Sequence, residues 1–242
     1  MTPTELFQAG RLQEAIETLG EEVRNNPLDA KRRTFLFELL CFAGEYDRAE
    51  KHLSILADSS QAAAMGALLY RSALHAEKIR QQMFENRTFP MAHKPSRRSS
   101  SRMGEFGASF TDADPRIGGA LELFVAGGYT WIDLEQIARI EIPKPRRLRD
   151  LLWSPAIVTT TPEYRAMELG EVLVPVLSPL SWSQEEDEIR VGRKTVWMED
   201  ETYGEIPFGQ KLFVMDGKEI PILELGTIEF ADGLGEGRAA SA

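Results

Sequence analysis

The chain has a single cysteine, Cys41, only three histidines and no long hydrophobic run. One cysteine cannot form an intramolecular disulfide, and such sparse use fits a reducing compartment. No apolar segment approaches the roughly 20 residues that cross a bilayer. The first residues also lack the basic and apolar regions of a secretory signal. We therefore expect a cytoplasmic protein with no membrane partner.

Motifs of catalysis and cofactor binding are also scarce. No P-loop, dinucleotide fingerprint or G-x-S-x-G nucleophile elbow occurs. His52, His75 and His93 have no cysteine or glutamate at the spacing of metal ligands. The sequence therefore predicts a protein that is not an enzyme and holds no cofactor.

The net charge of −10 is unevenly distributed. Residues 104–242 carry 25 acids and 13 bases, whereas residues 89–103 carry four bases and no acid. Nucleic-acid binding needs clustered lysine and arginine, and four bases neutralise few phosphates. We therefore expect no nucleic-acid partner and interpret the basic segment as a solvated loop.

A repeat of 34 residues dominates the first third of the chain. Gly10 of GRLQEAIETL aligns with Gly44 of GEYDRAEKHL, and alanine and leucine recur at matching offsets. A glycine lets the backbone reverse between two helices, and a small alanine lets those helices approach. The spacing resembles that of tetratricopeptide repeats. It lapses after two copies, because Lys78 occupies the position of a third glycine; residues 60–87 read as one or two further helices.

After residue 104 the pattern changes to short β-branched and aromatic runs separated by glycine and proline, which is typical of strands. The sequence thus predicts an α+β protein with four segments: a tetratricopeptide-like helical domain at 1–88, a basic Ser/Pro/Arg-rich linker or loop at 89–103, a β-rich domain at 104–231 and a tail at 232–242. The expected strands are Ala120–Val125, Tyr129–Ile132, Arg139–Ile142, Ala156–Thr160, Glu171–Val176, Glu188–Arg190, Lys211–Met215 and Ile220–Leu223.

Stacked helix pairs present their first helices on a concave face, which suits an amphipathic helix from a partner. We expect this face to bind a partner, since no catalytic group competes for it. The candidate residues are Thr4, Phe7, Lys31, Thr34, Glu38, Met65, Leu68 and Ser72.

Two other functions stay open. Asp112 and Asp114 alternate in TDADPR and could hold a divalent cation in a metal-dependent enzyme, although capping of a turn by either carboxylate is the simpler interpretation. The β-rich domain could instead make the protein a self-associating scaffold. The sequence leaves the oligomeric state undetermined.

The β-rich half also carries a specific family resemblance. The string DADPRIGGALELFVAGGYTWIDLEQIARI is followed by PRRLRDLLWSPA, VLVPVLSPLSW, VGRKTVW and GQKLFV. In this order the strings resemble the ImpE family, the TagJ-type accessory components of bacterial type VI secretion systems.

The resemblance implies a non-catalytic adaptor that binds an N-terminal helix of TssB, the small subunit of the contractile sheath. It also implies a role in sheath assembly or recycling, with an indirect link to the ClpV unfoldase. Arg–Asp pairs can lock loops together, and tryptophans can anchor a small core. We interpret the family-motif residues as mainly structural: Asp112, Asp114, Arg116, Trp131, Arg149, Asp150 and Trp153.

Overall fold

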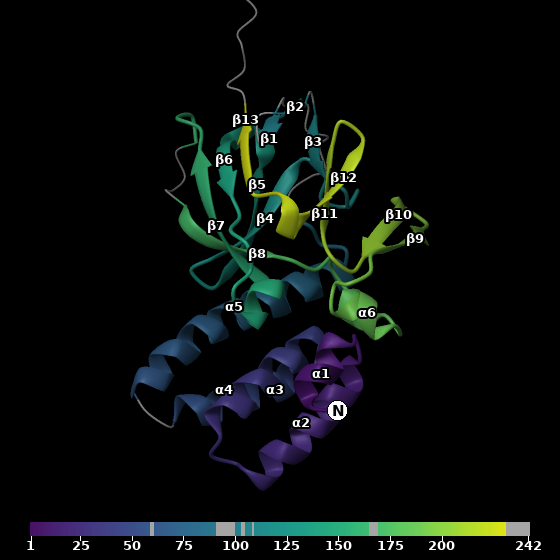
Figure 1. Cartoon of the computed structure of the whole chain (residues 1–242). Coiled ribbons are helices and arrows are strands. Elements are labelled where there is room, and N and C mark those ends of the chain that lie inside the picture. Colours follow the sequence, from purple (N-terminus) through teal and green to yellow (C-terminus); the bar gives the residue numbers. More distant parts are fainter. Residues whose placement is uncertain (59–60, 91–99, 103–104, 108, 165–168, 231–242) are drawn as a thin grey trace, which may run out of the picture.

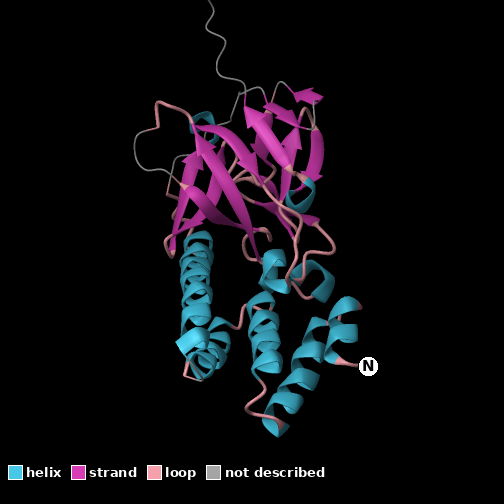
Figure 2. Ribbon diagram, turned by 60° about the vertical axis from the view of Figure 1, so that its left-hand side comes forward, coloured by secondary structure: helices cyan, strands magenta, loops and turns pink. Residues whose placement is uncertain are grey.

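The computed structural model describes the chain except for residues 59–60, 91–99, 103–104, 108, 165–168 and 231–242. It is an α+β protein in which a layer of helices lies against one end of a set of β-sheets (Figures 1 and 2). The predicted fold class is confirmed. In the part of the chain that the structure describes, no helix has both the length and the apolarity needed to cross a bilayer.

Five helices precede the strands, and four of them form the two predicted pairs. They are α1 (Pro3–Gln8), α2 (Leu12–Asn25), α3 (Ala30–Phe42), α4 (Tyr46–Ala57) and α5 (Gln61–Glu85). Gly10 and Gly44 lie between the helices of each pair with φ of 75° and 72°, where a side chain is disfavoured. Residues 61–85 form one long helix rather than a third pair.

The β-rich part contains an eight-stranded sheet, a three-stranded sheet and a hairpin. The large sheet has the order β2-β1-β13-β6-β7-β8-β4-β5, and every pairing in it is antiparallel. Its strands are β1 (Ser100–Arg102), β2 (Glu105–Gly107), β4 (Ala120–Val125), β5 (Gly128–Asp133), β6 (Ile137–Glu141), β7 (Trp153–Thr160), β8 (Gly170–Pro175) and β13 (Thr227–Phe230).

The smaller sheets and short helices complete this part. The three-stranded sheet has the order β12-β11-β3, and β9 pairs with β10. These elements are β3 (Phe110–Asp112), β9 (Val196–Asp200), β10 (Gly204–Phe208), β11 (Leu212–Met215), β12 (Lys218–Pro221), α6 (Asp187–Arg190) and the 3₁₀ turns η1 (Leu134–Gln136), η2 (Leu148–Leu151), η3 (Ser181–Ser183) and η4 (Ile222–Glu224).

Three sequence expectations differ from the structure. The expected strand Ile220–Leu223 ends at Pro221, and the residues after it form η4. Glu188–Arg190, expected as a strand, belongs to helix α6. Ser100–Arg102, assigned to the basic linker, forms β1 through pairing with β13 and β2. The pairing of β1 with β13 depends on a strand distant in sequence, which a local pattern does not show. Residues 91–99 of the linker and the tail at 232–242 lie outside the described residues.

One hydrophobic cluster spans the helical and β-rich parts, while a separate cluster lies within the β-rich part. The cluster of buried side chains that joins the helices also contains Phe124 of β4 and Trp153 of β7. Phe84, near the end of α5, packs with Trp131 of β5 in a further cluster. The helical layer is therefore fixed to the sheets by apolar burial, which is the main stabilising contribution in folding.

Helix α6 and Arg193, which follows it, reinforce this junction by binding the turns of both repeats. Arg190 donates to the carbonyl of Ala43 at 3.2 Å, and Arg193 donates to that of Gln8. The Asp187 carboxylate accepts from the backbone nitrogen of Gln13 at 2.9 Å. These bonds satisfy backbone groups that helix termini otherwise leave without partners.

Candidate functional site

An open groove of about 750 Å³ lies between the first helices of the two repeats and the segment 145–151. The helices are α1 and α3, and the segment contains η2. The lining is mainly apolar and consists of Thr4, Phe7, Gln8, Ala30, Lys31, Thr34, Phe35, Glu38, Pro145, Arg146, Arg147, Leu148 and Leu151. We call this surface the α1–α3 groove.

Aromatic packing fixes the helical wall of the groove. The Phe7 ring lies 5.5 Å from the Phe42 ring and 6.4 Å from the Phe35 ring, centroid to centroid. Phe7 is therefore mostly buried, while Phe35 and Thr34 remain half-buried towards the groove. This wall is rigid, because its side chains belong to the common core.

The opposite wall is held in place by Asp150. Its carboxylate accepts hydrogen bonds from the backbone nitrogens of Arg146 and Arg147, at 2.8 and 3.0 Å. The side chains of both arginines are exposed, whereas Leu148 and Leu151 pack against the helical core. Asp150 thus shapes a loop that places apolar side chains inward and cations at the margin.

The structure brings five of the predicted partner-binding residues together in this groove: Thr4, Phe7, Lys31, Thr34 and Glu38. It places the other three elsewhere. Met65 and Leu68 lie on α5, 68% and 58% exposed, and neither lines the groove. Ser72 lies in a separate cleft, where it faces Gly127.

Glu38 is the most unusual side chain in the groove. It is buried, and its Oε1 accepts a hydrogen bond from the Tyr70 hydroxyl at 3.0 Å. Burial raises its pKa to about 7, although Tyr70 and Arg149 favour the charged form. Arg149 in turn lies over the Tyr70 ring, 5.4 Å from its centroid. The groove therefore contains a carboxyl group that can change charge near neutral pH.

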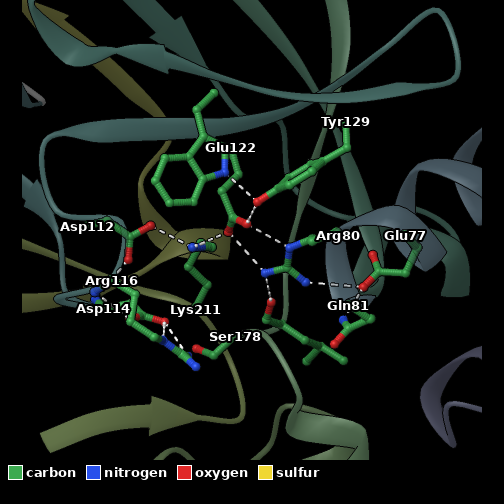
Figure 3. A network of polar contacts seen from close by, with 12 residues as sticks. Glu77, Arg80, Gln81, Asp112, Asp114, Arg116, Glu122, Tyr129, Ser178 and Lys211 are labelled. Carbon is green, nitrogen blue, oxygen red and sulfur yellow. Dashed lines mark hydrogen bonds and ion pairs between the residues drawn. The ribbon is translucent and has the colours of Figure 1, made fainter. Parts of the chain in front are cut away.

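A second polar assembly is buried between α5 and the sheets, and it lies outside the groove (Figure 3). Arg80 donates to both carboxylate oxygens of Glu122, at 2.8 and 3.0 Å, and to the carbonyl of Leu177 at 2.9 Å. Lys211 contacts Glu122 at 2.7 Å and Asp112 at 2.5 Å. We call these four side chains, Arg80, Asp112, Glu122 and Lys211, the ion network.

The ion network pairs two cations with two carboxyl groups, although burial outweighs the effect of Lys211 at Asp112 and raises the pKa of that carboxyl to about 7. Burial opposes charge on Glu122, but Arg80 and Lys211 hold its pKa below its usual range. Burial likewise opposes charge on Lys211, but Asp112 and Glu122 raise its pKa. Buried charges persist only when paired in this way. The network joins one helix to three strands or their flanks, which makes it a structural element.

The same contacts argue against a divalent-metal site at Asp112 and Asp114. Asp112 is paired with Lys211, and Asp114 is paired with Arg116 at 2.6 Å. A metal ion would have to displace both cations from buried positions. Among the described residues, no group of three metal-ligating side chains is assembled.

The motif tryptophans donate hydrogen bonds to neighbouring side chains, and Arg149 lies over the Tyr70 ring. Trp153 donates from Nε1 to Glu77 at 2.8 Å, and Trp131 donates from Nε1 to the Tyr129 hydroxyl. That hydroxyl donates to Glu122 at 2.6 Å, so Trp131 is connected to the ion network.

Sequence reasoning missed the second wall of the groove. Arg146 and Arg147 lie more than 100 residues from α3, and nothing local indicates that they meet it. A signal was present, because four of the six residues in KPRRLR are basic within an otherwise acidic half. Such a cluster in a loop is typical of a binding surface.

Comparison with known proteins identifies the family of this chain. The family model described as ImpE protein matches residues 104–229. The chain belongs to the ImpE family. It is 29% identical to the type VI secretion system accessory component TagJ of Pseudomonas aeruginosa, an alignment that covers 95% of this chain and 91% of that protein.

The fold also matches a solved structure. The crystal structure of protein VPA1032 from Vibrio parahaemolyticus superimposes with a TM-score of 0.83 at 21% identity, covering 96% of this ImpE-family chain and 98% of the other. At that identity the match concerns the fold alone. The arrangement of helix pairs against sheets therefore recurs in a distant protein.

Proposed function

We propose that this TagJ-like protein is a non-catalytic accessory component of a type VI secretion system, and that its α1–α3 groove binds an N-terminal helix of the sheath subunit TssB. In this role it assists assembly or recycling of the sheath. The observation that carries the proposal is the groove itself, together with the similarity to TagJ along almost the whole chain.

The size of the groove supports a helix as its occupant. A helix with its side chains is about 10–12 Å across, so a volume of about 750 Å³ holds half of its cross-section over roughly three turns. Three turns supply the i, i+3/i+4 and i+7 anchors of helix-in-groove recognition. The half-buried apolar residues Phe35, Leu148 and Leu151 provide contacts for such anchors.

The test is calorimetry with a peptide of the TssB N-terminal helix. Thr34→Arg places a long charged side chain in the groove and removes only a local hydrogen bond, from the Thr34 hydroxyl to the carbonyl of Ala30 one turn away. We expect this variant to lose at least tenfold in affinity. Thr159→Arg, at an exposed position of β7, adds the same charge outside the groove and is the matched control.

Two results would decide against the proposal. One is absence of heat with wild-type protein at high micromolar peptide. The other is equal affinity of the Thr34 and Thr159 variants, which would place the peptide on another surface. Leu68→Arg then examines the exposed face of α5 that the sequence also predicted.

A further inference from the structure

The charges of the α1–α3 groove are arranged in a pattern that an occupant has to match. Among the described residues that line it, Glu38 is the one acid, and it is buried in the wall. Lys31, Arg146 and Arg147 are cations with exposed side chains at its margin. We call these three residues the basic rim.

Among the described residues, only one of the two carboxylate oxygens of Glu38 accepts a hydrogen bond. Its Oε1 accepts from Tyr70, and no described residue is seen to donate to Oε2. Phe37 packs edge-on against the Tyr70 ring at 5.0 Å, so the donor is fixed in place. A ligand that covers Glu38 with purely apolar atoms would leave a buried carboxylate without a second partner, which is unfavourable.

The surroundings of Glu38 favour retention of its charge when a cation arrives. The charged or titratable groups around it are Tyr70 on α5, Arg149 and Asp150 on η2, and Cys41 on its own helix. The pKa of Glu38 is about 7, so its charged and neutral forms have similar free energies at neutral pH. A weak interaction with an ammonium or guanidinium group is therefore enough to keep Glu38 ionised. Arg149 lies over the Tyr70 ring and is not among the residues that line the groove.

We propose that the groove selects a helix that presents one lysine or arginine from its apolar face to Glu38 and carboxylates from its flank to the basic rim. This inference rests on the proposed function, because it specifies the chemistry of the bound helix. Hydrogen bonds that involve charged groups contribute more than neutral ones, so the central cation acts as the specificity determinant. The rim contributes mainly to the association rate and its dependence on salt.

The test uses three synthetic helical peptides of 14 residues with the same leucine face and glutamates along one flank. They differ at one central position of the apolar face, which is lysine, norleucine or glutamate. Norleucine keeps the aliphatic chain and removes the ammonium group. Affinities are measured by calorimetry at pH 6 and pH 8 for wild-type protein, Glu38→Gln and the control Glu21→Gln, which alters an exposed acid of α2.

At pH 8 we expect the lysine peptide to bind wild-type protein about tenfold more tightly than the norleucine peptide. The preference should shrink at pH 6, disappear in Glu38→Gln and persist in Glu21→Gln. Glutamine retains an oxygen for Tyr70, and unchanged thermal unfolding verifies the fold. The rim is tested with Arg146→Glu combined with Arg147→Glu, which should weaken the acidic-flank peptides and favour peptides with lysines on the flank.

Equal binding of lysine and norleucine peptides at pH 8, or a preference that survives Glu38→Gln, would overturn the charge pattern. Absence of binding by all three peptides at 1 mM would overturn it too. These failures are separable from failure of the proposed function. A TssB helix that binds in a Thr34-dependent manner without any effect of Glu38→Gln preserves the function and refutes the pattern. If Glu38→Gln changes the binding of the designed peptides but the TssB helix does not bind, the charge pattern is supported and the proposed function is refuted.

Discussion

Replacing Lys211 with methionine removes the central cation of the ion network while preserving most of the side-chain volume. Lys211 is 2% exposed and lies between Asp112 and Glu122. Glu122 keeps Arg80 as a partner, but Asp112 loses its ion-pair partner in a buried position. Asp112, whose pKa burial already raises to about 7, then has no cation to balance its ionised form.

The expected loss of stability is large. Removing one member of a buried ion pair costs about 3–5 kcal/mol in the free energy of unfolding. A typical domain has only about 5–15 kcal/mol in total, so Lys211→Met should remove a large share of the stability. The second substitution Asp112→Asn should recover part of the loss, because it removes the carboxylate that the first substitution left unpaired.

Urea unfolding followed by circular dichroism measures this loss as a lower midpoint at unchanged slope. Lys218→Met, at an exposed position of β12, is the matched control and should change the free energy of unfolding by less than about 0.5 kcal/mol. A loss below about 1 kcal/mol for Lys211→Met, or no recovery with Asp112→Asn, would refute the assignment of the network as a structural element.

Two further predictions concern the groove and the repeat turns. The pKa of Glu38 is about 7 in the folded protein against 4.5 for a free carboxyl, so the folded state binds more protons between these values. Glu38 should therefore lower the stability by about 3 kcal/mol as the pH rises from 4.5 to 7. Glu38→Gln should remove this part of the slope in urea unfolding at several pH values, while the part due to Asp112 remains. Gly44→Ala should destabilise more than Gly204→Ala, since both glycines have φ above 70° but a Cβ at Gly44 would lie 2.5 Å from the Trp182 ring, whereas nothing lies within 4 Å at Gly204. Equal melting temperatures for the two alanine variants would contradict the proposed contact.

The sequence alone determined the repeat architecture, because the information is local. Gly10 and Gly44 recur at the spacing of a helix pair, and each turn needs a residue that tolerates positive φ. The two helix pairs, the change from helices to strands and the family all follow from neighbouring residues. One wall of the groove could be predicted from the sequence for the same reason, because the first helix of each pair presents the same face to it.

The tertiary structure determined which residues form the opposite wall of the groove. The segment 145–151, the contacts of α6 and Arg193 with both repeat turns, and the ion network join residues that lie 42 to 185 positions apart. Asp112 and Asp114 show the consequence, because their spacing is compatible with a metal site until Lys211 and Arg116 are placed beside them. Burial determines which charges pair and which titrate near neutrality, and burial depends on the whole fold. Periodicity therefore located the wall of a groove, and only long-range packing supplied the opposite wall and the charges of the site.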